Sequence, residues 1–240
     1  MINSQQSLSI FFPCYNDKGT IDGLVYDAKQ TAQKLTQDFE IIVIDDGSTD
    51  GSRELLSEIK PKVPELRVIF HEKNRGYGGV LKTGTKAATK DLIFYTDGDA
   101  QYDVKELSLL WERMQDGIDV VNGYKLQRND AFHRIIIGQV YQAVMRFMFH
   151  LPIRDPDCDF RLMRRKIFEK VQLERDTGTV TVELVKKIDK AGFKFAQVGV
   201  HHYDRVYGTS QFFGFKRVAE TLWQMIFLWI ELMVLPDKKT

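Results

Sequence analysis

Cysteine is scarce in this sequence, with only Cys14 and Cys158 among 240 residues. Two thiols are too few for a disulfide framework or for a zinc site built from cysteine alone. We therefore expect a reduced chain that works in the cytoplasm. The polar segment Met1–Ser7 does not resemble a targeting signal, because the apolar segment that follows it ends at Pro13.

Neither sign of charge dominates, since 34 Lys and Arg residues face 33 Asp and Glu residues. Proteins that bind the phosphate backbone of nucleic acids are usually basic, so we expect no nucleic-acid partner. Long apolar runs are also missing. A bilayer-spanning helix needs about 18 or more consecutive apolar residues, and the nearest approach, Leu222–Leu235, is interrupted by Gln224 and Glu231.

Three glycine-based signatures are absent as well. The dinucleotide fingerprint fails at Leu81, after the glycine-rich stretch Asn74–Gly79. The sequence also contains neither a P-loop nor the Gly-x-Ser-x-Gly motif of serine hydrolases. These absences argue against a dehydrogenase, a P-loop nucleotidase and a hydrolase with a serine nucleophile.

What is present is an alternation of short apolar runs and helical patterns over the first half of the chain. The patterns predict strands at 8–12, 40–44, 66–70, 92–95 and 119–122, with Pro13 ending the first, and helices at 21–35, 52–59, 80–88 after a turn at 76–79, and 104–114. The less regular second half predicts helices at 135–149 and 181–191 and a strand at 193–201. Strands joined by helices predict an α/β fold, a Rossmann-like, mostly parallel sheet with helices on both faces.

Polar loops follow three of these strands, at 13–17, 45–48 and 97–101. In a parallel sheet, ligands bind beyond the carboxyl ends of the strands. Asp97 and Asp99 flank Gly98, which lets a ligand approach the backbone closely. Two such carboxylates suit Mg²⁺ or Mn²⁺, with substrate phosphates as further ligands. The alternative is a solvated turn.

Other polar residues suit the rest of a phosphate-bearing ligand. Asp46 can accept hydrogen bonds from a base or a ribose, while Asp50 or Ser52 caps the next helix. Arg and Lys suit phosphate binding, and candidates at Lys125, Arg128, Arg134 and Arg205 follow the acidic loop. Each of these cations, taken singly, is better explained as a solvated surface charge.

Several of these segments, taken in order, resemble the inverting glycosyltransferases of family 2, which have the GT-A fold. The resemblance lies in Phe12–Asp17, Ile42–Asp50, Asn74–Gly79 and Thr96–Gln101. It continues in Val120–Lys125, Asp155–Arg161, Val182–Glu183 and the loop around Arg205, which look like the dolichyl- and polyprenyl-phosphate sugar synthases. The resemblance covers roughly residues 8–215, so we expect a catalytic domain at 1–215 followed by an apolar C-terminal helix at 216–240.

The resemblance implies a role for each matching residue. Pro13, Tyr15, Asp17, Ile44 and Asp46 would hold the base and ribose of a nucleotide sugar. Asp97, Asp99 and Gln101 would hold Mg²⁺ or Mn²⁺ on its diphosphate, and Gly98 would contact the donor. Lys125, Arg134, Arg205 and Gln211 would surround the diphosphate and the acceptor phosphate. The sequence departs from the family at Asp17, where Glu is usual, and at Gln211, where Lys is common.

The resemblance further implies a metal-dependent, inverting transfer of a hexose from a GDP-mannose or UDP-glucose type of donor to a polyprenyl or dolichyl phosphate. Such an acceptor is already anionic and needs no general base. A saccharide hydroxyl acceptor would need one, and Asp157 is then the first candidate, ahead of Asp155 and Glu183. A second alternative is a catalytically silent, nucleotide-sugar-binding subunit of a membrane complex.

The apolar segment Leu222–Leu235 predicts a helix that is hydrophobic almost all round. Such a helix must be buried in the domain, packed against another copy of the chain, or placed in a membrane interface. Trp223 and Trp229 suit an interface, where the indole ring is half wet. We therefore expect peripheral association with the cytoplasmic face of a membrane, with homo-oligomer formation or core packing as the alternatives.

Overall fold

The structure is a computed structural model that describes residues 6–128, 132–205, 207 and 215–235. Its strands are β1 (Leu8–Cys14), β2 (Phe39–Asp45), β3 (Leu66–Phe70), β4 (Leu92–Thr96), β5 (Val120–Arg128), β6 (Phe160–Arg164) and β7 (Phe195–His202). Its helices are α1 (Ile21–Leu35), α2 (Ser52–Ile59), α3 (Gly76–Ala87), α4 (Leu107–Arg113), α5 (Phe132–Phe149), α6 (Val180–Lys190) and α7 (Phe215–Trp229). Short 3₁₀ segments lie at η1 (Lys60–Lys62), η2 (Val104–Glu106) and η3 (Arg165–Glu169), and a π-helical turn, η4 (Ile230–Val234), follows α7.

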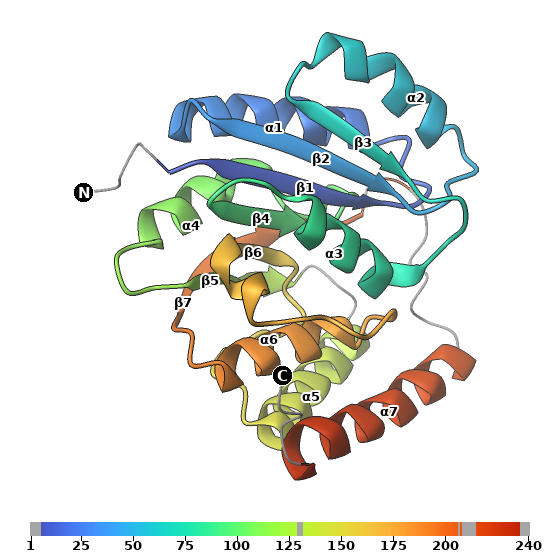
Figure 1. Cartoon of the computed structure of the whole chain (residues 1–240). Helices are drawn as coiled ribbons and strands as arrows, with labels where there is room; N and C mark the ends of the chain where they lie inside the picture. The colour runs from blue at the N-terminus through green and yellow to red at the C-terminus, as the bar shows by residue number, and fades with distance from the viewer. Residues whose placement is uncertain (1–5, 129–131, 206, 208–214, 236–240) are drawn as a thin grey trace.

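The strands form one sheet in the order β3-β2-β1-β4-β6-β5-β7 (Figure 1). β1 pairs in parallel with β2 and β4, β2 with β3, and β5 with β7, which confirms the mostly parallel sheet. β6 is antiparallel to both of its neighbours, β4 and β5. The sequence pattern missed this strand because Arg161 makes it look polar, although the side chain of Arg161 is fully buried.

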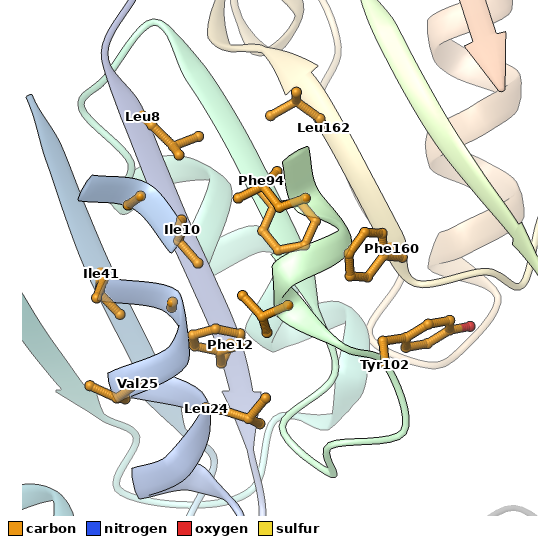
Figure 2. Close-up of a cluster of buried hydrophobic side chains, with 14 of the residues drawn as sticks. Leu8, Ile10, Phe12, Leu24, Val25, Ile41, Phe94, Tyr102, Phe160 and Leu162 are labelled. Atoms are coloured by element: carbon orange, nitrogen blue, oxygen red, sulfur yellow. The ribbon is translucent and has the colours of Figure 1, made fainter. Parts of the chain in front are cut away.

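Helices cover both faces of the sheet, as expected for strands joined by crossovers. On one face, α1, α2 and α4 pack on β1, β2, β4 and β6 in a core that contains Ile10, Val25 and Phe94 (Figure 2). On the other face, α3, η3 and α6 pack against Phe11, Ile42 and the neighbouring apolar residues.

A third layer lies outside α6. Met145 and Phe149 of α5 and Met225 and Leu228 of α7 form a separate core cluster with Val182 and Val185 of α6. Trp229 of α7 links this helix to α5, because its Nε1 donates to the carbonyl of Met148 at 2.8 Å. In Figure 1, α5, α6 and α7 accordingly lie together, away from β1, β2 and β3.

Two predicted boundaries at the site were wrong. β1 continues through Pro13 to Cys14, because its pairing with β4 ends at Phe11 and the missing N–H of Pro13 needs no partner there. The glycines at 76–79 form the first turn of α3 and not a turn before it. Two acceptors for this turn, Asp46 and Asp176, lie far away in the sequence, and a third, the side chain of Asn74, is local.

The C-terminal helix is confirmed, but its bounds shift to Phe215–Trp229 with a π-helical turn after it. Only part of its apolar surface is buried: Met225 and Leu228 face the core, whereas Leu222, Trp223, Ile226 and Phe227 are exposed. Within the described ranges, no helix is both long enough and apolar enough to cross a bilayer.

Candidate functional site

The predicted site residues converge at the edge of the sheet where β1, β2 and β4 end. A Cβ atom on Gly98 would lie only 2.3 Å from the carbonyl oxygen of Pro13, so the loops after β1 and β4 touch because residue 98 is glycine. Thr20 adds a hydrogen bond of 2.8 Å from its hydroxyl to the carbonyl of Gly98. The two loops form one unit, as expected from the sequence.

Asp97 lies in this unit with two carboxyl groups, Asp99 and Asp159, near it. Its Oδ1 accepts a hydrogen bond from the hydroxyl of Tyr77 at 2.8 Å. Burial raises the pKa of Asp97 well above its usual range, and repulsion from Asp159 and Asp99 acts in the same direction. The hydrogen bond from Tyr77 and the positive charge of Lys125 oppose the shift. A carboxylate held in this way is stabilised by any cation that binds beside it.

Asp159 is a residue of this site to which the sequence analysis gave no role. It immediately precedes β6, and because β6 runs antiparallel to β4, its start lies at the edge where β4 ends. The hydroxyl of Tyr95 lies 3.4 Å from Oδ1 of Asp159. Burial raises the pKa of Asp159 to about 6, against the opposing charges of Arg161 and Lys125. Recognising strand β6 would have identified it.

Asp99 is 5% exposed and contacts two residues of the predicted set. Its Oδ1 accepts the backbone N–H of Gln101 at 3.0 Å, and its Oδ2 is paired with the guanidinium of Arg205. The segment around Arg205 lies along the acidic loop, because the N–H of Tyr203 donates to the carbonyl of Gln101 at 2.8 Å and the Gln101 amide donates back to the carbonyl of Tyr203 at 3.0 Å. Asp99, Gln101 and Arg205 therefore form a contiguous group.

The loop after β1 contributes Tyr15 and Asp17. Tyr15 is 39% exposed, and its N–H donates to Oδ2 of Asp17 at 3.0 Å. Burial raises the pKa of Asp17 to about 6, with repulsion from Asp99 adding to the shift, while the Tyr15 N–H and Arg205 oppose it. Asp17 is thus a second buried carboxyl group beside Asp99 and Arg205.

Asp46 is also in the group but is fully engaged by the protein. Its carboxylate accepts the N–H groups of Arg75 and Gly76 at 2.9 and 3.0 Å and lies 2.7 Å from Nδ1 of His71. It is 3% exposed, and Ile44 is fully buried in β2. Asp46 therefore joins the end of β2 to the start of α3.

The second half of the chain brings Lys125 and Asp157 to the same edge. The Nζ of Lys125 donates to the carbonyl oxygen of Asp157 at 3.3 Å. The carboxylate of Asp155 is 5% exposed and hydrogen-bonded to Gln142. Glu183 lies elsewhere, on α6, where it accepts the N–H groups of Glu174 and Arg175. The main chain of Asp157 therefore lies beside Lys125, whereas the carboxylate of Glu183 is engaged by the backbone before α6.

Three predicted residues lie wholly or partly outside the described part of the structure. Gln211 lies outside the described residues, and so does the side chain of Arg134, although its backbone belongs to α5. The side chain of Arg128, at the end of β5, is likewise outside the description.

The donor set at the end of β4 fits a hard divalent cation. Asp97, Asp99 and Gln101 offer carboxylate and amide oxygens, the ligands that Mg²⁺ and Mn²⁺ prefer. The repulsion that raises the pKa of Asp97 would be relieved by positive charge. In the described part of the chain, no three His, Cys, Asp or Glu side chains come together as a ready metal cage. Part of the coordination shell would therefore come from the substrate, as is usual for Mg²⁺.

Comparison with known proteins identifies related sequences. The sequence model of the family described as "Glycosyl transferase family 2" matches residues 9–172. The undecaprenyl-phosphate 4-deoxy-4-formamido-L-arabinose transferase of Pectobacterium atrosepticum is 28% identical over 228 residues, which cover 94% of this chain and 68% of the relative. The protein of the same description from Yersinia enterocolitica is 28% identical, over 86% of this chain and 63% of its own length. The chain thus spans about two thirds of the relatives' length.

Solved structures show the same fold at lower identity. The glucosyl-3-phosphoglycerate synthase of Mycobacterium tuberculosis, in complex with Mn²⁺, UDP and glucosyl-3-phosphoglycerate, superposes with a TM-score of 0.72 and 18% identity. The superposition covers 98% of this chain and 82% of the synthase chain. The complex of that synthase with Mg²⁺ and UDP gives a TM-score of 0.71. These likenesses establish the GT-A architecture.

Proposed function

The chain belongs to glycosyltransferase family 2 and is a glycosyltransferase, and from this we propose that it transfers a sugar from a nucleotide sugar to a polyprenyl phosphate. The observation that carries the proposal is one group of residues at the end of β4, in which two acidic side chains, Asp97 and Asp99, adjoin the cation Arg205. The similarity to undecaprenyl-phosphate sugar transferases supports the lipid phosphate as acceptor.

In this proposal the donor lies across the ends of β1, β2 and β4. Pro13, Tyr15 and Asp17 contact the base and ribose, with Ile44 and Asp46 forming the floor beneath them. Asp46 then acts through the backbone that it fixes, because its carboxylate is already engaged by Arg75, Gly76 and His71. Asp97, Asp99 and Gln101 hold Mg²⁺ or Mn²⁺ on the diphosphate. Gly98, expected to let a ligand approach, instead lets this loop pack against the carbonyl of Pro13.

The bound cation would supply stabilisation of the negative charge that develops on the departing nucleoside diphosphate. Arg205 and Lys125 add positive charge beside the phosphates. From the family resemblance, Arg134 would add a further positive charge and Gln211 a neutral hydrogen-bond donor. The acceptor phosphate attacks the anomeric carbon from the face opposite the leaving group, which inverts the configuration. Arg205 is paired with Asp99 through Nη2, so the other N–H donors of the guanidinium are available in this proposal for phosphate.

Asp157 and Asp159 are the acidic residues on the acceptor side. A phosphate acceptor is already ionised, so neither residue has to remove a proton from it. With a hydroxyl acceptor, the general base needs a pKa close to the working pH. Asp159, whose pKa is raised to about 6 by burial, meets this condition.

The exposed apolar surface of α5 and α7 supports a position at a membrane. Phe147 on α5 is 80% exposed and Trp223 on α7 is 62% exposed, and Val144, Ile226 and Phe227 are exposed beside them in sequence. Large exposed apolar patches mark interaction sites. We propose that this surface rests on the cytoplasmic face of a membrane, where a polyprenyl phosphate presents its head group.

A transfer assay with radiolabelled donors tests the proposal. The full chain is incubated with membranes or with purified undecaprenyl phosphate and a panel of nucleotide sugars, including GDP-mannose, UDP-glucose and a nucleotide-linked 4-deoxy-4-formamido-L-arabinose. We expect an acid-labile glycolipid that forms with Mn²⁺ or Mg²⁺ and disappears with EDTA. Transfer to a saccharide without lipid product would favour the hydroxyl-acceptor alternative, and nucleotide binding without turnover on any acceptor would favour a silent subunit.

A further inference from the structure

The glycine-rich turn Asn74–Gly79 has no ligand in the proposed function, although it contacts the acidic site directly. Two of its N–H groups have protein acceptors: that of Gly76 donates to Asp46 and to Oδ1 of Asn74, both at 3.0 Å, and that of Gly78 donates to the carbonyl of Asp176 at 3.0 Å. These two donors are used within the protein and are not offered to a phosphate. The contacts fix the backbone of the turn.

The turn positions the side chain of Tyr77. The phenol hydroxyl donates to Oδ1 of Asp97 at 2.8 Å, while the ring packs on the core cluster beneath α3. A carboxylate has two oxygens, and each oxygen accepts more than one hydrogen bond or cation contact. A hydrogen bond at Oδ1 thus fixes the rotation of the Asp97 carboxylate and is compatible with a cation on the same group.

The backbone that carries Tyr77 is itself held tightly on both sides. A Cβ atom on Gly78 would lie 2.1 Å from the carbonyl oxygen of Arg175, and one on Gly76 would lie 2.4 Å from that of Asp176. These glycines allow the segment 174–177 to pack directly on the turn. That segment is fixed in turn by Glu183, which is 1% exposed and accepts the N–H groups of Glu174 and Arg175 at 2.9 and 3.0 Å.

We propose that Tyr77 is a positioning residue that holds the Asp97 carboxylate in the orientation in which it binds the divalent cation of the donor. The inference rests on the proposed function, in which Asp97 is a metal ligand. Partners that hydrogen-bond to a metal ligand orient it, and their loss commonly lowers metal affinity by about 10- to 100-fold. The turn, packed against the segment 174–177, would then keep the hydroxyl of Tyr77 in place.

The test is the variant Tyr77→Phe, which removes the hydroxyl and keeps the ring in the core. Mn²⁺ affinity is measured by electron paramagnetic resonance, with Mn²⁺ alone and with Mn²⁺ plus UDP or GDP. We expect the dissociation constant for Mn²⁺ to rise about 10-fold or more, and transfer activity to recover as Mn²⁺ is raised. The matched control is Tyr102→Phe, a buried tyrosine whose ring packs at 5.5 Å from that of Phe160.

Reference variants Asp97→Asn and Asp99→Asn separate this inference from the proposed function. If both reference variants weaken Mn²⁺ binding and Tyr77→Phe binds Mn²⁺ like the unmodified chain, the positioning role is wrong and the metal site stands. If Tyr77→Phe and Tyr102→Phe weaken binding equally, Tyr77 is only structural and the inference again fails. If neither reference variant changes Mn²⁺ binding, the metal assignment itself is wrong, and the role of Tyr77 falls with it.

Discussion

The guanidinium of Arg205 is paired with Oδ2 of Asp99, across 106 positions of sequence. Asp17 lies close enough for Arg205 to lower its pKa as well, so this one cation serves two buried carboxyl groups. A proposed phosphate-binding residue thus stands beside a proposed metal ligand. In the proposed function, Asp99 would be one of the residues that hold the divalent cation, and Arg205 beside it would bind the diphosphate.

The variant Arg205→Ala should weaken binding of a nucleoside diphosphate much more than binding of the corresponding nucleoside. Losing a charge-assisted phosphate contact costs about 2–3 kcal/mol, or roughly 30- to 150-fold in affinity. Calorimetric titration with both compounds, in the presence of Mn²⁺, measures the difference. Arg113→Ala on the exposed side of α4 is the control. Equal losses for nucleoside and diphosphate would mean that Arg205 is structural.

Asp99→Ala should abolish metal-dependent transfer and leave the fold intact. Asp99 lies in a loop at the end of β4 and its partners are Gln101 and Arg205, so its loss removes no part of the apolar core. Turnover with Mn²⁺ and thermal unfolding are the two measurements. Asp103→Ala, which removes an exposed cap whose Oδ1 accepts the N–H of Lys105, is the matched control. Near-normal turnover of Asp99→Ala would disprove the metal assignment.

Asp157→Asn should be far milder than Asp99→Ala when the acceptor is a phosphate, because no proton has to be removed from it. Asp159→Asn should have the larger effect of the two acceptor-side variants, since Asp159 shares the buried acidic site with Asp97. Rates at saturating donor, measured with polyprenyl phosphate, give the ranking. Near-complete loss in Asp157→Asn with normal substrate binding would instead indicate a base or an acceptor-orienting role for Asp157.

The metal-free protein should be more stable at pH 5 than at pH 7.5. Burial raises the pKa values of Asp17 and Asp159 to about 6, so the folded chain binds more protons than the unfolded chain between about pH 4 and 6. The free energy of unfolding therefore falls as the pH rises, by about 1 to 2 kcal/mol for each group between pH 5 and pH 7.5. Carboxylates with lowered pKa values, such as Asp50 and Asp91, lose their stabilisation only as the pH falls through values below this window.

Urea unfolding in EDTA at the two pH values measures this difference. Mn²⁺ should reverse it, because a bound cation favours the ionised carboxylates at pH 7.5. In Asp159→Asn the difference between the two pH values should shrink. A metal-free chain that gains stability steadily from pH 5 to 7.5 would contradict the prediction.

Replacing Trp223 and Phe227 of α7 together by Asp should prevent binding to anionic vesicles in a flotation experiment. These side chains are 62% and 48% exposed, and their rings contact each other at 4.9 Å between centroids. Ending the chain at Glu220 is a weaker test, because it also removes the buried residues Met225 and Leu228. Leu109→Asp, at an exposed apolar residue of α4, is the control. Flotation that is unchanged in the double variant would exclude α7 as the membrane contact.

The sequence predicted the first half of the fold closely because its signals are local. The bounds of α1 and α2 follow from apolar spacing, and the predicted ranges 21–35 and 52–59 agree with the structure. The second half depends on long-range partners. Arg161 is fully buried because it donates to Asn122, to the hydroxyl of Tyr95 and to backbone carbonyls, and no local pattern reveals those acceptors.

How well the site could be predicted also depends on whether its contacts are local or long-range. Asp97, Asp99 and Gln101 share one loop, so their proximity follows from sequence. Asp159 joins them only through the antiparallel pairing of β4 with β6. The hydrogen bonds of Asp46 could not be predicted from the sequence either, because its partners His71, Arg75 and Gly76 come from the start of α3 and the segment before it.

The pairing of β4 with β6 is also the boundary between the two halves of the sheet, β3-β2-β1-β4 and β6-β5-β7. Strands β1 to β4, with the loops that carry Asp17 and Asp97, lie on one side of this boundary, and strands β5 to β7, with Lys125, Asp159 and the segment around Arg205, lie on the other. The proposed phosphate site is made from both sides, because Arg205 pairs with Asp99 across the boundary. The relative position of these charges therefore depends on one antiparallel pairing of strands.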